Sequence, residues 1–96
     1  MAVHTSFDTA EALEVATTLG IDFDVEPFTL DEFRDGMNVE LEHGQRDPET
    51  NVTGDDPIIT GKIALAHLRE MPDYYVRLAA MEAEAEAEMA EKLDPA

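Results

Sequence analysis

Apolar residues recur every three or four positions along most of the chain, with polar residues between them, as in helices that bury one face. Within residues 7–19 the apolar positions on one such face are Ala12, Leu13, Ala16 and Leu19. Asp8 with Glu11 supplies an N-terminal cap for this segment, and Gly20 supplies a C-terminal cap. The pattern therefore predicts a first helix over residues 7–19.

A second helix has the clearest start in the sequence. Thr29 and Glu32 form a capping box, in which each side chain bonds the backbone of the other residue. Apolar residues at helical spacing continue from there to His43, and Gly44 follows as a residue that ends helices. We therefore expect the second helix to end at Gly44.

The third and fourth helices are separated by Pro72. Asp56 is a good N-cap, and Pro57 fits the first helical position because its missing N–H has no partner there in any case. The third helix is predicted to run to about residue 70 or 71. The fourth is predicted over residues 73–93, and its second half alternates Glu and Ala, which are strong helix formers and poor strand formers.

These elements predict an all-α fold, a small helical bundle of about four helices with short loops. Residues 1–96 are expected to form a single domain with a core over about residues 7–81. The acidic, Glu/Ala-rich helix over about residues 82–93 is expected to be solvated. The loops predicted over residues 22–27 and 45–55 are short, so neighbouring helices are expected to run roughly antiparallel.

The amino-acid composition limits the kinds of fold and functional site that the chain can form. The 96 residues suffice for one small domain, and 44% of them are hydrophobic, so the chain is predicted to fold rather than stay disordered. It has no cysteine, which excludes disulfides, thiolate metal sites and cysteine nucleophiles. No glycine-rich phosphate loop or nucleophile elbow occurs, and no organic cofactor is expected.

The net charge of the chain limits the classes of partner that it can bind. There are 23 Asp and Glu residues against 6 Lys and Arg, which gives a formal charge of -17 and argues against nucleic-acid or anionic-membrane partners. One interpretation is a salt-adapted protein of a halophilic archaeon, favoured because only Lys62 and Lys92 are lysines; the other is an acidic protein with a basic protein partner. The small core is compatible with a homodimer. No secretion signal or apolar spanning run occurs, so a cytoplasmic protein is predicted.

Two pairs of polar residues fall where the core is expected. On the second predicted helix Glu40 lies within the apolar stripe and His43 lies on its flank, in an E-x-x-H pattern. On the third, His67 and Glu70 continue an apolar row in the reverse order, H-x-x-E. If the two helices pack antiparallel, the two patterns match in order. We therefore predict that Glu40, His43, His67 and Glu70 converge.

Three interpretations of this cluster remain open. Two imidazoles and two carboxylates suit a divalent transition metal such as Zn, Fe or Mn, held at one ion or shared with a second subunit. An open coordination position would permit redox or hydrolytic chemistry, whereas a closed one would hold the helices together. The same groups can also form a buried hydrogen-bond network without metal, in an interaction or structural module. A catalytic acid/base pair is the third interpretation.

Two further features have simpler interpretations. The loop over residues 47–56 offers oxygen side chains at alternate positions, yet Val52 stands where a calcium-binding EF-hand loop needs glycine, so turns and a helix cap are favoured. Tyr74 and Tyr75 are expected to be half-buried anchors of the fourth helix, with packing over the Glu70 end of the cluster as the alternative.

Long segments of the chain resemble a small family of uncharacterised proteins of bacteria, archaea and phages, classed as a domain of unknown function. The segments include GMNVELEHG at residues 36–44 and TGKIALAHLREMPDYY at residues 60–75. The resemblance covers about residues 19–81 and implies no activity or ligand set. It leads us to expect that the first helix and the Glu/Ala tail are particular to this chain.

Overall fold

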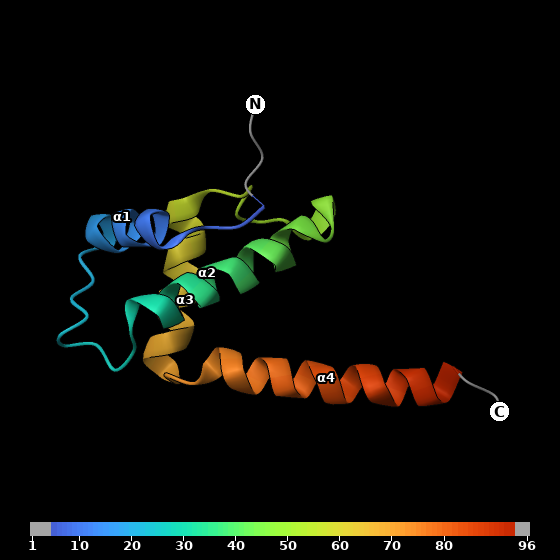
Figure 1. Ribbon diagram of the computed structural model, residues 1–96. Coiled ribbons are helices and arrows are strands. Elements are labelled where there is room, and N and C mark those ends of the chain that lie inside the picture. Colours follow the sequence, from blue (N-terminus) through green and yellow to red (C-terminus); the bar gives the residue numbers. More distant parts are fainter. Residues whose placement is uncertain (1–4, 94–96) are drawn as a thin grey trace.

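The computed structural model describes residues 5–93, which contain four α-helices and no strand (Figure 1). The all-α class predicted from the sequence is confirmed. The two ends of the predicted domain, residues 1–4 and 94–96, lie outside the described residues. The helices are α1 (Thr9–Leu19), α2 (Leu30–Gln45), α3 (Pro57–Glu70) and α4 (Tyr74–Leu93), with a short 3-10 helix η1 (Pro48–Thr50) between α2 and α3.

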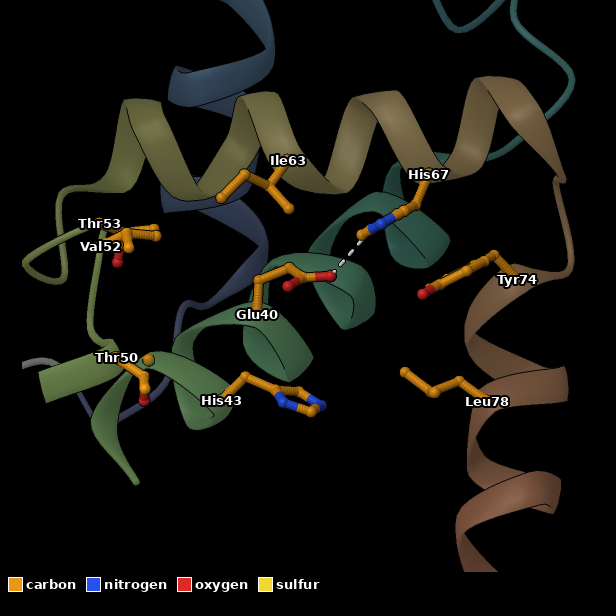
Figure 2. Close-up of a pocket in the computed structure, with 10 residues that line it drawn as sticks. Glu40, His43, Thr50, Val52, Thr53, Ile63, His67, Tyr74 and Leu78 are labelled. Atoms are coloured by element: carbon orange, nitrogen blue, oxygen red, sulfur yellow. Dashed lines mark hydrogen bonds and ion pairs between the residues drawn. The ribbon is translucent and has the colours of Figure 1, made fainter. Parts of the chain in front are cut away.

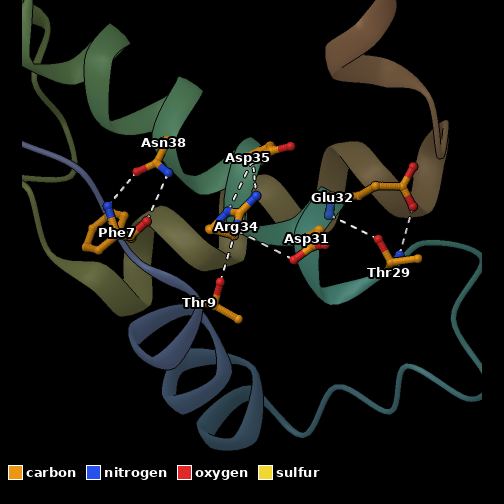
Figure 3. A network of polar contacts seen from close by, with 8 residues as sticks. All are labelled: Phe7, Thr9, Thr29, Asp31, Glu32, Arg34, Asp35 and Asn38. Atoms are coloured by element: carbon orange, nitrogen blue, oxygen red, sulfur yellow. Dashed lines mark hydrogen bonds and ion pairs between the residues drawn. The ribbon is translucent and has the colours of Figure 1, made fainter.

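The predicted helix starts are confirmed by their capping bonds. In α2, Thr29 Oγ1 accepts from the backbone N–H of Glu32 at 3.1 Å, and Glu32 Oε1 accepts from that of Thr29 at 2.8 Å (Figure 3). Asp8 forms the same kind of capping box with Glu11 at the start of α1. Just before α3, the Asp56 side chain accepts the backbone N–H groups of Ile58 and Ile59, which belong to the first turn of the helix. Each cap satisfies donors that a helix start leaves unpaired.

The two glycines predicted to end helices behave differently. Gly20 caps α1 in the left-handed conformation, with φ 73°, which confirms the prediction. Gly44 does not end α2, which continues to Gln45. A Cβ atom at Gly44 would lie 2.8 Å from Asn51 Oδ1, so this glycine lets the following loop approach the helix closely.

The core lies where α1, α2 and α3 meet. Figure 1 shows α3 lying across α2. Gly61 of α3 lies against α1, because a Cβ atom there would collide with Val15. The largest fully buried side chains are Phe33, Met37, Leu41, Leu68 and Thr60. Thr60 is accommodated because its hydroxyl donates to the Asp56 carbonyl at 2.7 Å.

The segment before α1 is tied to the middle of α2 by one side chain. Asn38 Oδ1 accepts from the Phe7 backbone N–H at 2.6 Å, and Asn38 Nδ2 donates to the Phe7 carbonyl at 3.1 Å (Figure 3). We call this pair of bonds the Phe7–Asn38 latch. Nearby, Arg34 donates to Thr9 Oγ1 at 3.0 Å and pairs with Asp35. These polar contacts join α2 to the start of α1 while the apolar faces pack beneath them.

The fourth helix leaves the body, and most of its length is exposed to solvent (Figure 1). Its one buried side chain within the described residues is Tyr75, and residues 83–92 are all exposed. The Glu/Ala half is therefore helical and solvated, as predicted. Among residues 5–93, no helix combines the length and the apolar character that crossing a bilayer requires.

Candidate functional site

A cavity of about 390 Å³ lies between α2, α3, the start of α4 and the loop that follows η1 (Figure 2). Its polar side includes Glu40, His43 and His67. Val52, Ile63 and Leu78 form apolar walls, and Tyr74 adds an aromatic face. The cavity thus combines a few polar groups with apolar walls, as small-molecule sites commonly do.

Glu40 is at the centre of a hydrogen-bond network that joins three helices. Its Oε2 atom accepts the Tyr75 hydroxyl at 2.7 Å and lies 3.0 Å from His67 Nδ1. His67 Nδ1 is also 3.1 Å from the Tyr75 hydroxyl oxygen. We call these three side chains, from α2, α3 and α4, the Glu40–His67–Tyr75 network. The Glu40 side chain is only 14% exposed, which confirms its predicted place inside the apolar stripe of α2.

We assign the tautomer of the neutral His67 ring from the contacts of the network. Tyr75 gives its single hydroxyl proton to Glu40, and an ionised carboxylate has none to give. The short contact between Nδ1 and Glu40 therefore requires the proton to sit on Nδ1 of His67. In the neutral imidazole, Nε2 then holds a lone pair. Nε2 has no hydrogen-bond partner among residues 5–93, and His67 lines the cavity with its side chain 31% exposed.

Tyr75 remains a neutral donor in this network. Burial is the main cause that raises the pKa of Tyr75 well above its ordinary value, and the hydrogen bond to Glu40 and the charge of that carboxylate add to it. A phenolate here would face the Glu40 carboxylate at hydrogen-bond distance with little water between them. The Tyr75 hydroxyl consequently keeps its proton and orients the carboxylate.

Tyr74 fixes the plane of the imidazole. Its ring stacks on His67 with centroids 4.2 Å apart and an interplanar angle of 3°. Tyr75 meets Tyr74 edge-on, with centroids 4.9 Å apart. Both tyrosines anchor α4, as predicted from their position after Pro72, but they pack on Glu40 and His67 instead of over Glu70.

The structure brings together only part of the predicted four-residue cluster. Glu40 and His67 are in contact, and Figure 2 shows the His43 ring directed into the space between α2 and α4 on the same cavity. Glu70 is exposed, does not line the cavity, and makes no bond to the other three. Within residues 5–93 no group of three or more His, Asp or Glu side chains is placed to hold a metal ion.

Glu70 lies apart from the cluster, at the end of α3. Glu40 and His67 are in contact, whereas Glu70 is the last residue of α3, where its side chain is exposed. Transition-metal binding by Glu40, His43, His67 and Glu70 together remains a prediction that this arrangement does not support.

Sequence reasoning did not assign Tyr75 to the site, although a signal was present. Gly36 precedes Glu40 by one turn of α2, and a Cβ atom at Gly36 would lie 2.5 Å from the Tyr75 ring. The glycine therefore makes room for the ring, and the hydroxyl then reaches the carboxylate one turn further along. A glycine in a core stripe next to a buried acid indicates that a large side chain packs there.

The loop between α2 and α3 forms turns, as favoured from the sequence. Asn51 Oδ1 accepts from the Gly54 backbone N–H at 3.0 Å and from the Thr53 hydroxyl at 3.2 Å. Asp55 follows with a positive φ of 66°. These bonds hold the loop against Gly44, so that it forms one wall of the cavity.

One comparison with known proteins gives a match. The family described as "Protein of unknown function (DUF5661)" matches residues 12–84, which include every residue of the Glu40–His67–Tyr75 network. No curated protein and no solved structure matches the chain. The match begins inside α1, so the expectation that the first helix is particular to this chain was wrong; the last part of α4 lies outside the match.

Proposed function

Because the chain belongs to the DUF5661 family, whose description names no activity, we propose a function from its own cavity: it binds a small organic cation with an apolar body. An alkylammonium or alkylguanidinium group would donate hydrogen bonds to Glu40 Oε1 and His67 Nε2, with its carbon chain against Ile63 and Leu78. The observation that carries this proposal is the pair of acceptor atoms that the network leaves unused.

Those two acceptors are Glu40 Oε1 and His67 Nε2. The network uses Glu40 Oε2 and His67 Nδ1, and the other atom of each group has no hydrogen-bond partner among the described side chains. Two acceptors on one cavity favour a ligand that brings donors and positive charge. A partly buried carboxylate attracts such a group more strongly than an exposed one, because less water screens it.

The rest of the cavity favours an organic cation over a bare ion. Ile63 and Leu78 offer walls on which methylene groups are removed from water, at about 0.8 kcal/mol for each buried CH₂. The formal charge of -17 raises the concentration of cations near the whole surface and disfavours anionic ligands. Size, charge and apolar walls thus point to the same ligand class.

The proposal is tested by calorimetric titration with n-butylammonium, n-butylguanidinium, n-butanol and butyrate at 0.15 M KCl. We expect the two cations to bind and the alcohol and the anion not to bind. Glu40→Gln should weaken cation binding about tenfold or more, since it removes a charge-assisted hydrogen bond worth about 1.5–3 kcal/mol. Glu70→Gln is the matched control, because it removes the same charge from an exposed site three residues after His67.

The proposal is wrong if neither cation binds, or if Glu40→Gln and Glu70→Gln weaken binding equally. The first outcome would leave the Glu40–His67–Tyr75 network as a structural connection between helices in an interaction module. The second would mean that cations respond only to the net charge of the protein.

A divalent transition metal, Zn, Fe or Mn, is a second candidate for the same cavity. It is favoured by the bond between Glu40 and His67 Nδ1, since metal-binding histidines usually have such a carboxylate behind them. His67 Nε2 and His43 would then supply the ligands, with Glu40 in support. Chelator-treated protein distinguishes the candidates: metal binding should be lost in both His43→Ala and His67→Ala, whereas ammonium binding should survive His43→Ala.

A further inference from the structure

A groove runs between α2 and α4, and its floor is apolar. It consists of two adjoining hollows of about 370 Å³ and 260 Å³, which share Val39 of α2 and Ala79 of α4. Tyr75 and Val76 lie in the floor of the first hollow, and Ala83 lies in the second. Val76 is 72% exposed, so the described part of the chain leaves it largely uncovered. The groove follows the part of α4 that diverges from the body in Figure 1.

Acidic side chains line both walls of this groove. They are Glu32, Asp35 and Glu42 on α2, with Glu82 and Glu86 on α4. Glu32 serves the α2 capping box, and Asp35 is paired with Arg34. The other three acids form no ion pair or hydrogen bond within residues 5–93, and Arg46 is the single Lys or Arg side chain among the described groove residues.

We propose that this groove docks a helix of a partner protein that has an apolar stripe flanked by Lys and Arg. The apolar floor matches the stripe, and Glu42, Glu82 and Glu86 lie where cationic side chains of the docked helix would neutralise them. The groove follows α4 from Val76 to Glu86, which is about 16 Å of helix at 1.5 Å per residue. A docked helix of about three turns would fill that length.

Charge also decides against a second copy of this chain as the occupant. The most exposed helix that a second copy could offer is α4, which carries Glu82, Glu84, Glu86, Glu88 and Glu91. Placing it in the groove would bring like charges together along both walls, and their repulsion disfavours that complex. A basic helix instead gains from each of these carboxylates, mainly in its rate of association.

Binding is measured by fluorescence anisotropy of a labelled 18-residue peptide of Leu and Lys in a helical amphipathic order, titrated with the full chain at 0.15 M KCl. A peptide of identical composition in scrambled order keeps the charge and loses the apolar stripe. We expect the ordered peptide to bind about tenfold more tightly than the scrambled one, since only the ordered peptide can cover the floor.

Two pairs of variants locate the site. Glu82→Gln with Glu86→Gln should weaken binding of the ordered peptide about threefold to tenfold, because groove carboxylates are lost. Glu84→Gln with Glu88→Gln removes the same charge from the opposite face of α4 and should change binding less than about twofold. Ala79→Gln puts a larger side chain where the two hollows join and should weaken binding more than Ala80→Gln, its control on the outer face.

Three outcomes would overturn the proposal. The scrambled peptide could bind as tightly as the ordered one, or the two double variants could weaken binding equally; either result means that charge alone attracts the peptide. Alternatively, light scattering could show a dimer of the chain that dissociates in Ala79→Gln and not in Ala80→Gln. That result would assign the groove to a second copy.

Discussion

The body formed by α1, α2 and α3 and the helix α4 are held in place by different interactions. The body encloses Phe33, Met37 and Leu41 completely, so removal of apolar surface from water stabilises it. The described part of α4 buries only Tyr75, and it is attached by the Glu40–His67–Tyr75 network, by ring stacking and by the packing of Tyr74 and Leu78 against the core. One chain therefore combines a unit stabilised by its core with a helix that is held through its first turns alone.

This difference teaches that the two binding surfaces we propose lie beside a helix that buries few side chains. The cavity and the groove both lie beside the first turns of α4, on either side of the tyrosines that attach it. Regions with few buried apolar contacts open locally at lower free energy than the core does. We therefore expect α4 to exchange its amide hydrogens faster than α2. Substitutions in the body should also lower the free energy of unfolding more than substitutions in α4 do.

The largest effect is expected from the body. Phe33→Ala removes a side chain with no exposed surface and leaves a cavity among three helices, at a cost of about 3–5 kcal/mol. For a chain of this size that is a large part of the free energy of unfolding, so chemical denaturation should show a much lower midpoint. A loss below about 1 kcal/mol would mean that the core is not the source of stability. Val25→Ala, at an exposed position, is the control.

A smaller effect is expected where α4 meets the body. Gly36→Ala places a methyl group against the Tyr75 ring, which cannot move without losing its bond to Glu40. Overpacking of this kind costs about 1–3 kcal/mol. Hydrogen exchange should show faster exchange across the first turns of α4 with little change at α1. Equal acceleration in all helices would show that α4 and the body unfold as one unit.

Tyr75→Phe isolates the hydroxyl and should cost about 1–2 kcal/mol, because the ring still packs while Glu40 loses a donor. It should also change the pH dependence of stability. The pKa of Tyr75 is raised in the folded protein, so its contribution is complete below the unfolded value of about 10 and is lost as pH rises above it. Wild-type stability should fall above pH 10 more steeply than that of the variant, as measured by urea denaturation; parallel curves would contradict this role.

The smallest global effect is expected at the far end of α4. Ala85→Gly lowers helix propensity by about 1 kcal/mol, yet Ala85 is exposed and contacts no part of the core. The free energy of unfolding of the body should change by less than about 0.5 kcal/mol, while circular dichroism shows a modest loss of helix. A loss of the full 1 kcal/mol from the global free energy of unfolding would mean that the solvated half of α4 unfolds together with the body.

The sequence predicted the helices well because their signals are local. Capping by Thr29 and Asp56 and termination at Gly20 depend on neighbours within a turn, so the residues alone specify them. The predicted end of α2 at Gly44 differs from the observed end at Gln45, and Gly44 instead gives room to Asn51, seven residues away, a contact that only the folded chain makes. Gly44 is a residue type that often ends helices, but here it allows a tertiary contact with Asn51.

The candidate site was predicted in part for a similar reason. The helical wheel placed Glu40 inward because its own helix determines which way it faces, and the structure agrees. The position of Glu70 depends on the angle between two helices, which spacing along one helix does not encode. For Tyr75 anchoring was favoured over packing on the cluster, because its partner, Glu40, is 35 residues away in the sequence.

The Phe7–Asn38 latch has a consequence for the order in which the chain folds. It joins residues 31 positions apart, and closing a flexible loop of that length costs about 3 kcal/mol in entropy. Two hydrogen bonds return about 1 kcal/mol each, so the latch cannot form before the apolar faces of α1 and α2 have met. It should therefore have a φ-value near zero, with Asn38→Ala accelerating unfolding while leaving the refolding rate unchanged.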